Sequence, residues 1–344
     1  MSRWGHTLLE VTAVLAASGG AVVGAHGLVG KPSDRAPTTR AFLRPATDLL
    51  APTTLPITSS AAGTFLGIRD EVMLDHLRSQ PVVESRMNRG GSSISLRVSF
   101  ASGARAAFKP LQTNPQTVPR KEVASYRLNR WFGLNVVPPA TMRTLHHDDL
   151  VTLLAADSTW AKARIEKESI FDAEGFTRGE VSFWIPSIID ARLDSADQVK
   201  QWTEWMTIGN EVPPERVNLM TQLSRLLIFD MLQNNSDRFS GGNLLTSPDG
   251  KTLFWMDNTF GFQVDANGNE KCRTYIRKSQ KFSRSFVARL RQLDFNELRA
   301  ALAAEPGVLR DEEMKSVIQR KDWVVKYIDG LIAQHGESQV LVFP

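Results

Sequence analysis

Two aspartates stand on polar turns that follow apolar segments. Asp237 lies in the stretch LLIFDMLQNNSDRFSGGNLL, and Asp257 follows the apolar run KTLFWM. Carboxylates in such places often cap helices or stabilise turns. Two of them can also divide a reaction, because one can accept the proton of an attacking hydroxyl while the other holds a divalent cation. The order of helix, Asn-rich loop, hairpin and strand ending in Asp favours this second interpretation, phosphoryl transfer.

Three further polar residues fit the same chemistry. Lys109 ends an apolar run, where a lone buried ammonium would be costly without a partner. Glu122, near the start of the next helical pattern, is the obvious counter-ion, although an ordinary structural ion pair would also explain these two residues. Asn243 shares the loop of Asp237. Its amide oxygen and the Asp257 carboxylate are hard ligands of the kind that Mg²⁺ prefers.

The first half of the chain predicts a small mixed sheet with one helix. Apolar residues alternate with polar ones over 94–100, which indicates a half-buried strand, and a turn leads to its hairpin partner over 104–109. Helical spacing over 123–132 ends at a glycine and a Pro-Pro pair. Apolar runs at 150–155 and 181–185 predict further strands.

The second half is helical in character. Helical patterns cover Gln222–Leu232, 286–304 and 312–335, with one short strand before Asp257. A sheet-rich part followed by a helix-rich part predicts an α+β fold with two lobes. We place the lobes at 64–190 and 191–344.

Several stretches occur in the order and at the spacing of a known family. Together they span roughly residues 88–262, and a compatible helical tail reaches about residue 336. The chain resembles the secretory-pathway atypical kinases, the family of the Golgi casein kinase, the proteoglycan xylose kinase and four-jointed. The stretches that carry the resemblance are GGSSISLRVSF, ARAAFKP, KEVASYRLNRWFGLNVVPP, LLIFDMLQNNSDR and FWMDNTFGF.

The resemblance implies a nucleotide site in the first lobe. Gly90 and Gly91 would belong to a hairpin that covers the phosphates of ATP. Lys109 would contact the nucleotide phosphates and pair with Glu122.

The resemblance also implies roles for the two aspartates. Asp237 would be the catalytic base, and Asp257 would bind Mg²⁺ or Mn²⁺, with Asn243 as a second metal ligand. The chain departs from the family at Phe239, where His is usual, and at its lone cysteine, Cys272, where the eukaryotic members have disulfides.

Composition excludes several other classes of protein. The chain has 41 basic and 37 acidic residues, a net charge of +4 and a pI near 9.2, but the charges are spread along it. No basic arm or patch indicates nucleic-acid binding. Cys272 cannot form an intramolecular disulfide, and no Cys/His spacing indicates a zinc site.

The first 30 residues predict export or membrane tethering. Val11–Ala25 is apolar and follows Arg3, but it is shorter than the roughly 20 residues of a membrane-spanning helix. We therefore expect a signal peptide or weak signal anchor at 1–30 and a flexible Pro/Thr/Ser-rich linker at 31–63. The alternative is an ordinary helix in a cytoplasmic protein.

The favoured function is an active kinase that transfers the γ-phosphate of ATP to a hydroxyl of a protein Ser or Thr. A sugar or glycan is the next acceptor to consider, and a lipid kinase would use the same catalytic parts. The contrasting hypothesis is a pseudokinase that serves as a binding scaffold. Retention of both carboxylates, Asp237 and Asp257, together with Lys109 and Glu122 argues against the scaffold.

Overall fold

The computed structural model describes residues 63–89, 91–155 and 159–344, all within the unit Thr39–Pro344. The predicted signal segment and nearly all of the predicted linker lie outside the described residues, as does Gly90. Within the described ranges, no helix has both the length and the apolar character needed to cross a membrane.

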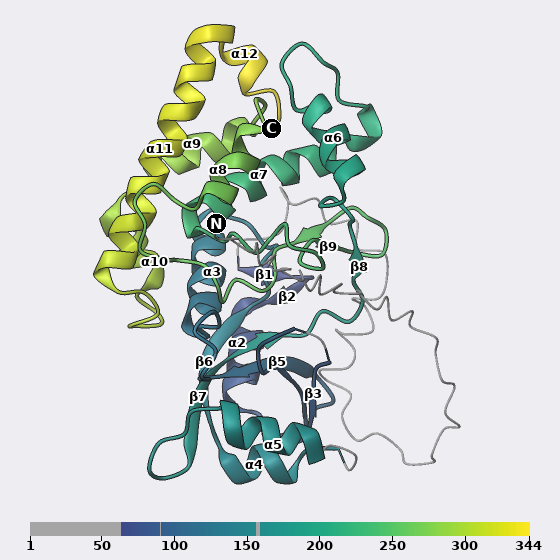
Figure 1. Ribbon diagram of the computed structural model, residues 1–344, viewed down its shortest axis with the longest axis vertical. Coiled ribbons are helices and arrows are strands. Elements are labelled where there is room, and N and C mark those ends of the chain that lie inside the picture. Colours follow the sequence, from purple (N-terminus) through teal and green to yellow (C-terminus); the bar gives the residue numbers. More distant parts are fainter. Residues whose placement is uncertain (1–62, 90, 156–158) are drawn as a thin grey trace, which may run out of the picture. The chain divides into compact units, whose positions relative to one another are not determined.

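A five-stranded antiparallel sheet forms the first part of the described chain (Figure 1). Its strands pair in the order β3-β4-β5-β7-β6, and their register is continuous except for one irregularity near the start of β3. The alternation seen in the sequence places Leu96, Val98 and Phe100 on the buried face. The bounds are β3 Val82–Met87, β4 Leu96–Phe100, β5 Arg105–Pro110, β6 Ala140–His146 and β7 Phe176–Phe183.

Helices border this sheet on several sides. Helix α2 (Asp70–Ser79) contacts β6 and β7, and α3 (Arg120–Trp131) contacts the same two strands. Gly133 follows the C-cap of α3 with φ of +72°, so the predicted glycine stop is confirmed. The first two described strands, β1 (Thr64–Phe65) and β2 (Ile68–Arg69), form a small hairpin before α2.

The strand predicted at 150–155 is wrong. Residues 150–152 are the end of α4 (His147–Thr152), and after it Leu154 forms an isolated β-bridge with Ser85. At the start of α4 the His146 side chain accepts a hydrogen bond from the Asp148 amide. That cap satisfies one of the free amides of the first turn. Helix α5 (Thr159–Glu168) follows and buries Ala161 and Ile165 beside the sheet.

The second part of the described chain is mainly helical and is built around α7 (Val217–Gln233). Nearly every residue of α7 after its first turn is buried, and α8 and α11 both pack on it. A helix that is buried on all sides forms the centre of a lobe. The other helices described here are α6 Ala196–Trp205, α8 Glu270–Arg277, α9 Arg284–Gln292, α10 Phe295–Leu302, α11 Asp311–His335 and α12 Glu337–Val340, and Pro214–Arg216 forms a 3₁₀ turn.

One predicted helix is two helices. The pattern over 286–304 divides into α9 and α10 because Leu293 takes an extended conformation and Asp294 caps a new helix. The Asp294 carboxylate accepts a hydrogen bond from the Glu297 amide at 2.8 Å. Both helices keep their apolar residues on the core side, so one continuous period fits them almost equally well.

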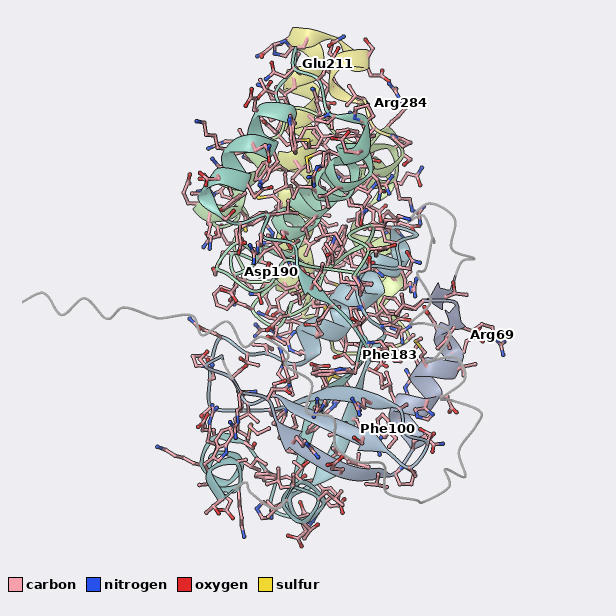
Figure 2. The ribbon with its side chains drawn as sticks, turned by 90° about the vertical axis from the view of Figure 1, so that its right-hand side faces the viewer. Arg69, Phe100, Phe183, Asp190, Glu211 and Arg284 are labelled. Atoms are coloured by element: carbon pink, nitrogen blue, oxygen red, sulfur yellow. The ribbon has the colours of Figure 1, made fainter. Side chains whose placement is uncertain are left out.

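The segment after β7 joins the two parts of the fold. It runs from Phe183 at the sheet toward the helices at Asp190 (Figure 2). There β8 (Ile189–Asp190) pairs with β9 (Leu245–Thr246), which in turn pairs with β10 (Leu253–Phe254). This small sheet brings the segment next to the loops that carry Asp237 and Asp257.

Candidate active site

The loop after α7 presents Asp237 to solvent. Helix α7 ends at Asn234, which has a left-handed backbone with φ of +58°, a conformation that Asn tolerates. The Asn234 amide oxygen accepts a hydrogen bond from the backbone N–H of Asn269, and the Asn235 amide oxygen accepts one from the Asp237 N–H. Buried asparagines therefore hold the loop while the Asp237 side chain stays exposed.

Asn243 lies directly beside Asp237. Its Nδ2 donates to the Asp237 carboxylate oxygen Oδ2 at 3.0 Å and to the Asp237 carbonyl oxygen at 3.2 Å. Because the amide nitrogen faces Asp237, the Asn243 Oδ1 remains as an acceptor. The structure thus brings together the predicted base and the predicted second metal ligand.

Asp257 is held by contacts with both parts of the fold. Its Oδ1 accepts hydrogen bonds from Lys109 Nζ at 2.5 Å and from Thr259 Oγ1 at 3.1 Å. Its backbone has φ of +55°, a left-handed conformation that is uncommon for a residue with a side chain and often occurs at functional sites. The side chain of Asp257 is 46% exposed and that of Lys109 only 9%, so the carboxylate links a buried ammonium to an open surface.

The predicted ion pair between Lys109 and Glu122 is wrong for this structure. Lys109 pairs with Asp257, whereas the Glu122 carboxylate accepts hydrogen bonds from the backbone N–H and the Nδ2 of Asn258, the latter at 2.9 Å. The competing donor explains the difference, because Asn258 satisfies the buried carboxylate from the residue next to Asp257. The two predicted partners therefore meet through the Asp257-Asn258 segment.

Arg238 and Asn258 are functional candidates that the sequence did not reveal. The Arg238 guanidinium is fully buried and donates to Asp230, to the Met256 carbonyl and to the Asn258 amide oxygen. Gln233 also donates to the Asn258 amide oxygen, at 3.0 Å. These bonds connect the end of α7, the Asp237 loop and the Asp257 segment. In the sequence, only their positions next to the two aspartates, in Asp237-Arg238 and Asp257-Asn258, could have pointed to them.

Glu180 is a second residue that sequence reasoning missed. It lies on β7 directly opposite Lys109 on β5, and it is 1% exposed. Its Oε2 has no hydrogen-bond partner among the described residues. Burial, reinforced by the negative charge of Glu122, raises the pKa of Glu180 well above its ordinary value. Only the strand register places this carboxyl beside Lys109, so no local motif could have identified it.

The charges at the site influence each other. Burial disfavours the charge on Lys109, but the carboxylates of Asp257, Glu122 and Glu180 outweigh that effect and raise its pKa. Desolvation in the cleft acts against the Asp257 charge, but Lys109 more than compensates and lowers the pKa of Asp257. Burial raises the pKa of Glu122 despite its attraction to Lys109. Lys109 and Asp257 therefore form a charged pair at neutral pH.

The larger pocket at the site has a volume of about 800 Å³ and a polar lining. Asp237 and Asp257 both line it, and Gly91 contributes from the hairpin between β3 and β4. Protein sites for small ligands span roughly 300–1,000 Å³, so this pocket has room for the reacting groups. The remaining lining residues are Ser92, Ser93, Gln116, Thr117, Ser236, Ser240, Gly241, Asn243, Thr259, Phe260, Asn269 and Lys271.

A smaller and more apolar pocket adjoins it. Its volume is about 260 Å³, and Asn243 and Asp257 line both pockets. Lys109, Glu122 and Glu180 are among its polar lining residues. A mainly apolar pocket that includes a buried lysine suits a planar base with a phosphate tail. Its apolar lining comes from Ala107, Pro138, Phe183, Trp184, Ile185, Ile188, Leu245 and Met256.

The donors at the junction of the two pockets fit a divalent cation that is shared with phosphate oxygens. Asp257 offers an exposed carboxylate and Asn243 a free amide oxygen, both hard ligands. Within the described ranges, no group of three or more His, Cys, Asp or Glu side chains is arranged to hold a metal ion. A protein that binds Mg²⁺ together with a nucleotide commonly supplies only one or two carboxylates.

Phe239 is the residue of this loop at which the sequence departs from the kinases that it resembles. Its ring stacks on Tyr275 of α8, with ring centroids 3.8 Å apart and an angle of 13° between the ring planes. The ring of Trp202 lies next to it, with a distance of 6.4 Å between ring centroids. Such contacts stabilise a loop by apolar packing instead of a polar network. The loop that carries Asp237 is therefore anchored to α8 by an aromatic stack.

A sheet-rich lobe with a buried lysine, a helix-rich lobe and two pockets where their loops meet define a two-lobed atypical kinase fold. Solved structures show the same fold. The Golgi casein kinase with Mn/ADP bound is 16% identical over 79% of this chain and 78% of that chain, with a TM-score of 0.64. Hydra Fam20 with sugar is 13% identical over 86% of this chain and 97% of that chain, with a TM-score of 0.66.

A second structure of the Golgi casein kinase, 14% identical, covers 91% of this chain and 96% of that chain with a TM-score of 0.64. The chain matches no family model and no curated protein sequence. The resemblance predicted from the sequence is thus confirmed at the level of the fold.

Proposed function

We propose that the chain is an atypical kinase that transfers the γ-phosphate of ATP to a hydroxyl acceptor, with a protein Ser or Thr as the favoured acceptor. One observation carries the proposal. Asp257, paired with the buried Lys109, and Asp237, exposed on its own loop, line one pocket of about 800 Å³. This arrangement supports a nucleotide side and an acceptor side within one cavity.

In this proposal the smaller pocket takes the adenine base, and Lys109 binds the nucleotide phosphates. Asp257 and Asn243 would hold Mg²⁺ or Mn²⁺, and such an ion neutralises charge on the phosphates. The Mn/ADP in one structure of the Golgi casein kinase supports this assignment by analogy. Arg238 and Asn258 keep the two aspartate-bearing segments in place through buried hydrogen bonds.

Asp237 acts on the acceptor. Its carboxylate orients the hydroxyl and accepts the hydroxyl proton as the oxygen attacks phosphorus. Asn243 fixes the orientation of that carboxylate through the 3.0 Å bond to Oδ2. A polar pocket with Ser, Thr, Asn and Gln side chains favours a hydrophilic acceptor. Sugars share that property, and the sugar in the hydra structure supports a sugar as the second candidate.

The test is transfer of labelled phosphate from ATP by the purified full-length chain, with Mg²⁺ or Mn²⁺. Acidic and neutral proteins form one arm of the assay and free sugars the other, with Asp237→Ala as the matched control. We expect labelling in the protein arm that depends on Asp237. Nucleotide binding without any transfer would instead identify a pseudokinase scaffold.

A further inference from the structure

Lys271 lines the larger pocket. It is the only Lys or Arg among the described residues that line this pocket, which also contains Asp237 and Asp257. No carboxylate lies within ion-pair distance of its ammonium in the described part of the chain. Instead, Lys271 Nζ donates a hydrogen bond to Ser240 Oγ at 2.6 Å.

Ser240 brings this ammonium close to the catalytic loop. The Ser240 backbone N–H donates to the Asp237 carbonyl oxygen at 3.0 Å, which forms a turn that begins at the predicted base. The bond from Lys271 to Ser240 therefore places a positive charge over the turn that carries Asp237. Ser240 is a weak, neutral partner, so the ammonium keeps donors for a second acceptor.

Hydrogen bonds tie the backbone of Lys271 to the end of α7, where the loop of Asp237 begins. Lys271 lies in the first turn of α8, and its N–H donates to the capping side chain of Asn269 at 2.8 Å. The Asn269 N–H in turn donates to Asn234 at the end of α7. The Phe239-Tyr275 stack joins the same helix to the same loop. The lysine and the predicted base thus belong to one connected unit.

Phosphoryl transfer benefits from a cation at this place. Negative charge on the oxygens of the transferred group must be stabilised in the transition state, and positioned basic side chains commonly contribute. Lys109 is engaged with Asp257, and Arg238 is fully buried against Asp230. Among the described residues that line the larger pocket, Lys271 is the remaining cation near Asp237.

We propose that Lys271 is a further catalytic residue, which contacts the phosphoryl group during transfer. This inference rests on the proposed kinase function. The acceptor oxygen forms a bond to the γ-phosphorus while the bond from that phosphorus to the β,γ-bridging oxygen breaks. The hydroxyl proton passes to Asp237, and ADP leaves with the bridging oxygen. Lys271 keeps its proton and donates a hydrogen bond to a non-bridging oxygen of the transferred group.

The test uses Lys271→Met in the full-length chain, with Lys271→Arg as a charge-preserving variant and Lys326→Met, on the exposed face of α11, as the control. We expect Lys271→Met to lower kcat about 10²-fold, the scale for losing one donor to a transition state. Lys271→Arg should recover part of kcat, and Lys326→Met should match the wild type. ADP binding should not change, whereas binding of ADP with aluminium fluoride, which mimics the transferred group, should weaken at least tenfold.

The alternatives give different results. A higher KM for the acceptor with kcat unchanged would mean that Lys271 binds the acceptor, and it would overturn the proposal. Equal binding of ADP with aluminium fluoride to wild type and Lys271→Met would also overturn it. A wild type that transfers no phosphate rejects the kinase function itself, and the role of Lys271 with it.

Discussion

Asp257 and Asp237 are held in place by different kinds of contact. Asp257 has a left-handed backbone, an ion pair with Lys109 from the sheet and a neighbour, Asn258, that is bonded to Glu122 of α3. Asp237 contacts only residues of its own lobe, Asn235, Ser240 and Asn243, among the interactions found for it. The segment of Asp257 thus connects both lobes, whereas the loop of Asp237 belongs to one.

This difference suggests a division of labour. A residue that links both lobes is suited to a nucleotide that binds between them. A residue held by one lobe and exposed to the larger pocket is suited to the second substrate. The same difference predicts that substitutions at the two aspartates will affect separate steps.

The largest effect is expected for Asp257→Ala. This change removes the counter-ion of a buried ammonium and one of the two proposed metal ligands. Metal-dependent ATP binding and phosphate transfer should both be lost, because the phosphates lose the cation that neutralises them. Transfer of labelled phosphate over a range of Mg²⁺ and Mn²⁺ concentrations measures the effect. Full activity at any metal concentration would contradict the metal role.

Asp237→Ala should reduce turnover by roughly 10² or more, the usual scale for removing a positioned general base. The exposed side chain contributes no buried contact, so the melting temperature should remain within a few degrees of the wild type. Steady-state kinetics beside thermal unfolding measures both. A parallel loss of stability and activity would indicate a structural role for the loop aspartate.

Lys109→Met and Glu122→Gln should each reduce activity, and the double variant should lose less than the sum. The two side chains do not touch, but they meet the adjacent residues Asp257 and Asn258. Residues in one network typically show interaction energies of about 0.5–3 kcal/mol. A double-mutant cycle on kcat/KM measures this energy. If the two losses of activity add strictly, the Asp257-Asn258 segment does not couple Lys109 to Glu122.

The smallest effect, on the pH dependence of stability, is expected for Glu180→Gln. The folded protein raises the pKa of Glu180, so the folded state binds a proton that the unfolded state releases as the pH rises above about 4.5. Stability should therefore fall with rising pH in the range above the unfolded pKa. Gln cannot titrate, so the free energy of unfolding of Glu180→Gln should not fall in this way as the pH rises.

Denaturant unfolding at several pH values tests this prediction. The free energy of unfolding of Glu180→Gln should depend less on pH than that of the wild type. Glu166→Gln, an exposed change on α5, serves as a matched control. Identical pH profiles for wild type and Glu180→Gln would mean that Glu180 is not protonated on folding.

The sequence predicted the parts of this structure that rest on local periodicity. The strand at Leu96–Phe100, the helix from Arg120 and the central helix α7 all follow patterns of period 2 or 3.6. The positions of Asp237 and Asp257 on polar loops could also be predicted from the sequence. The break between α9 and α10 was not, because Asp294 caps a helix without interrupting the apolar pattern.

The connections between distant residues could not be predicted from one sequence. Glu180 lies opposite Lys109 only because β5 and β7 pair in that register. Glu122 bonds to Asn258 instead of Lys109 because the fold brings the Asp257 segment against α3. Long-range pairing decides which buried charges meet, and no local pattern encodes it. The roles assigned to the individual site residues therefore remain predictions.

The most direct test of the division of labour is ATP affinity measured by calorimetry, with the same metal, for wild type, Asp237→Ala and Asp257→Ala. Asp237→Ala should bind ATP nearly as tightly as the wild type, although its turnover has fallen. Asp257→Ala should show no metal-dependent binding. Equal losses of affinity at the two positions would contradict the assignment of one aspartate to the nucleotide and the other to the acceptor.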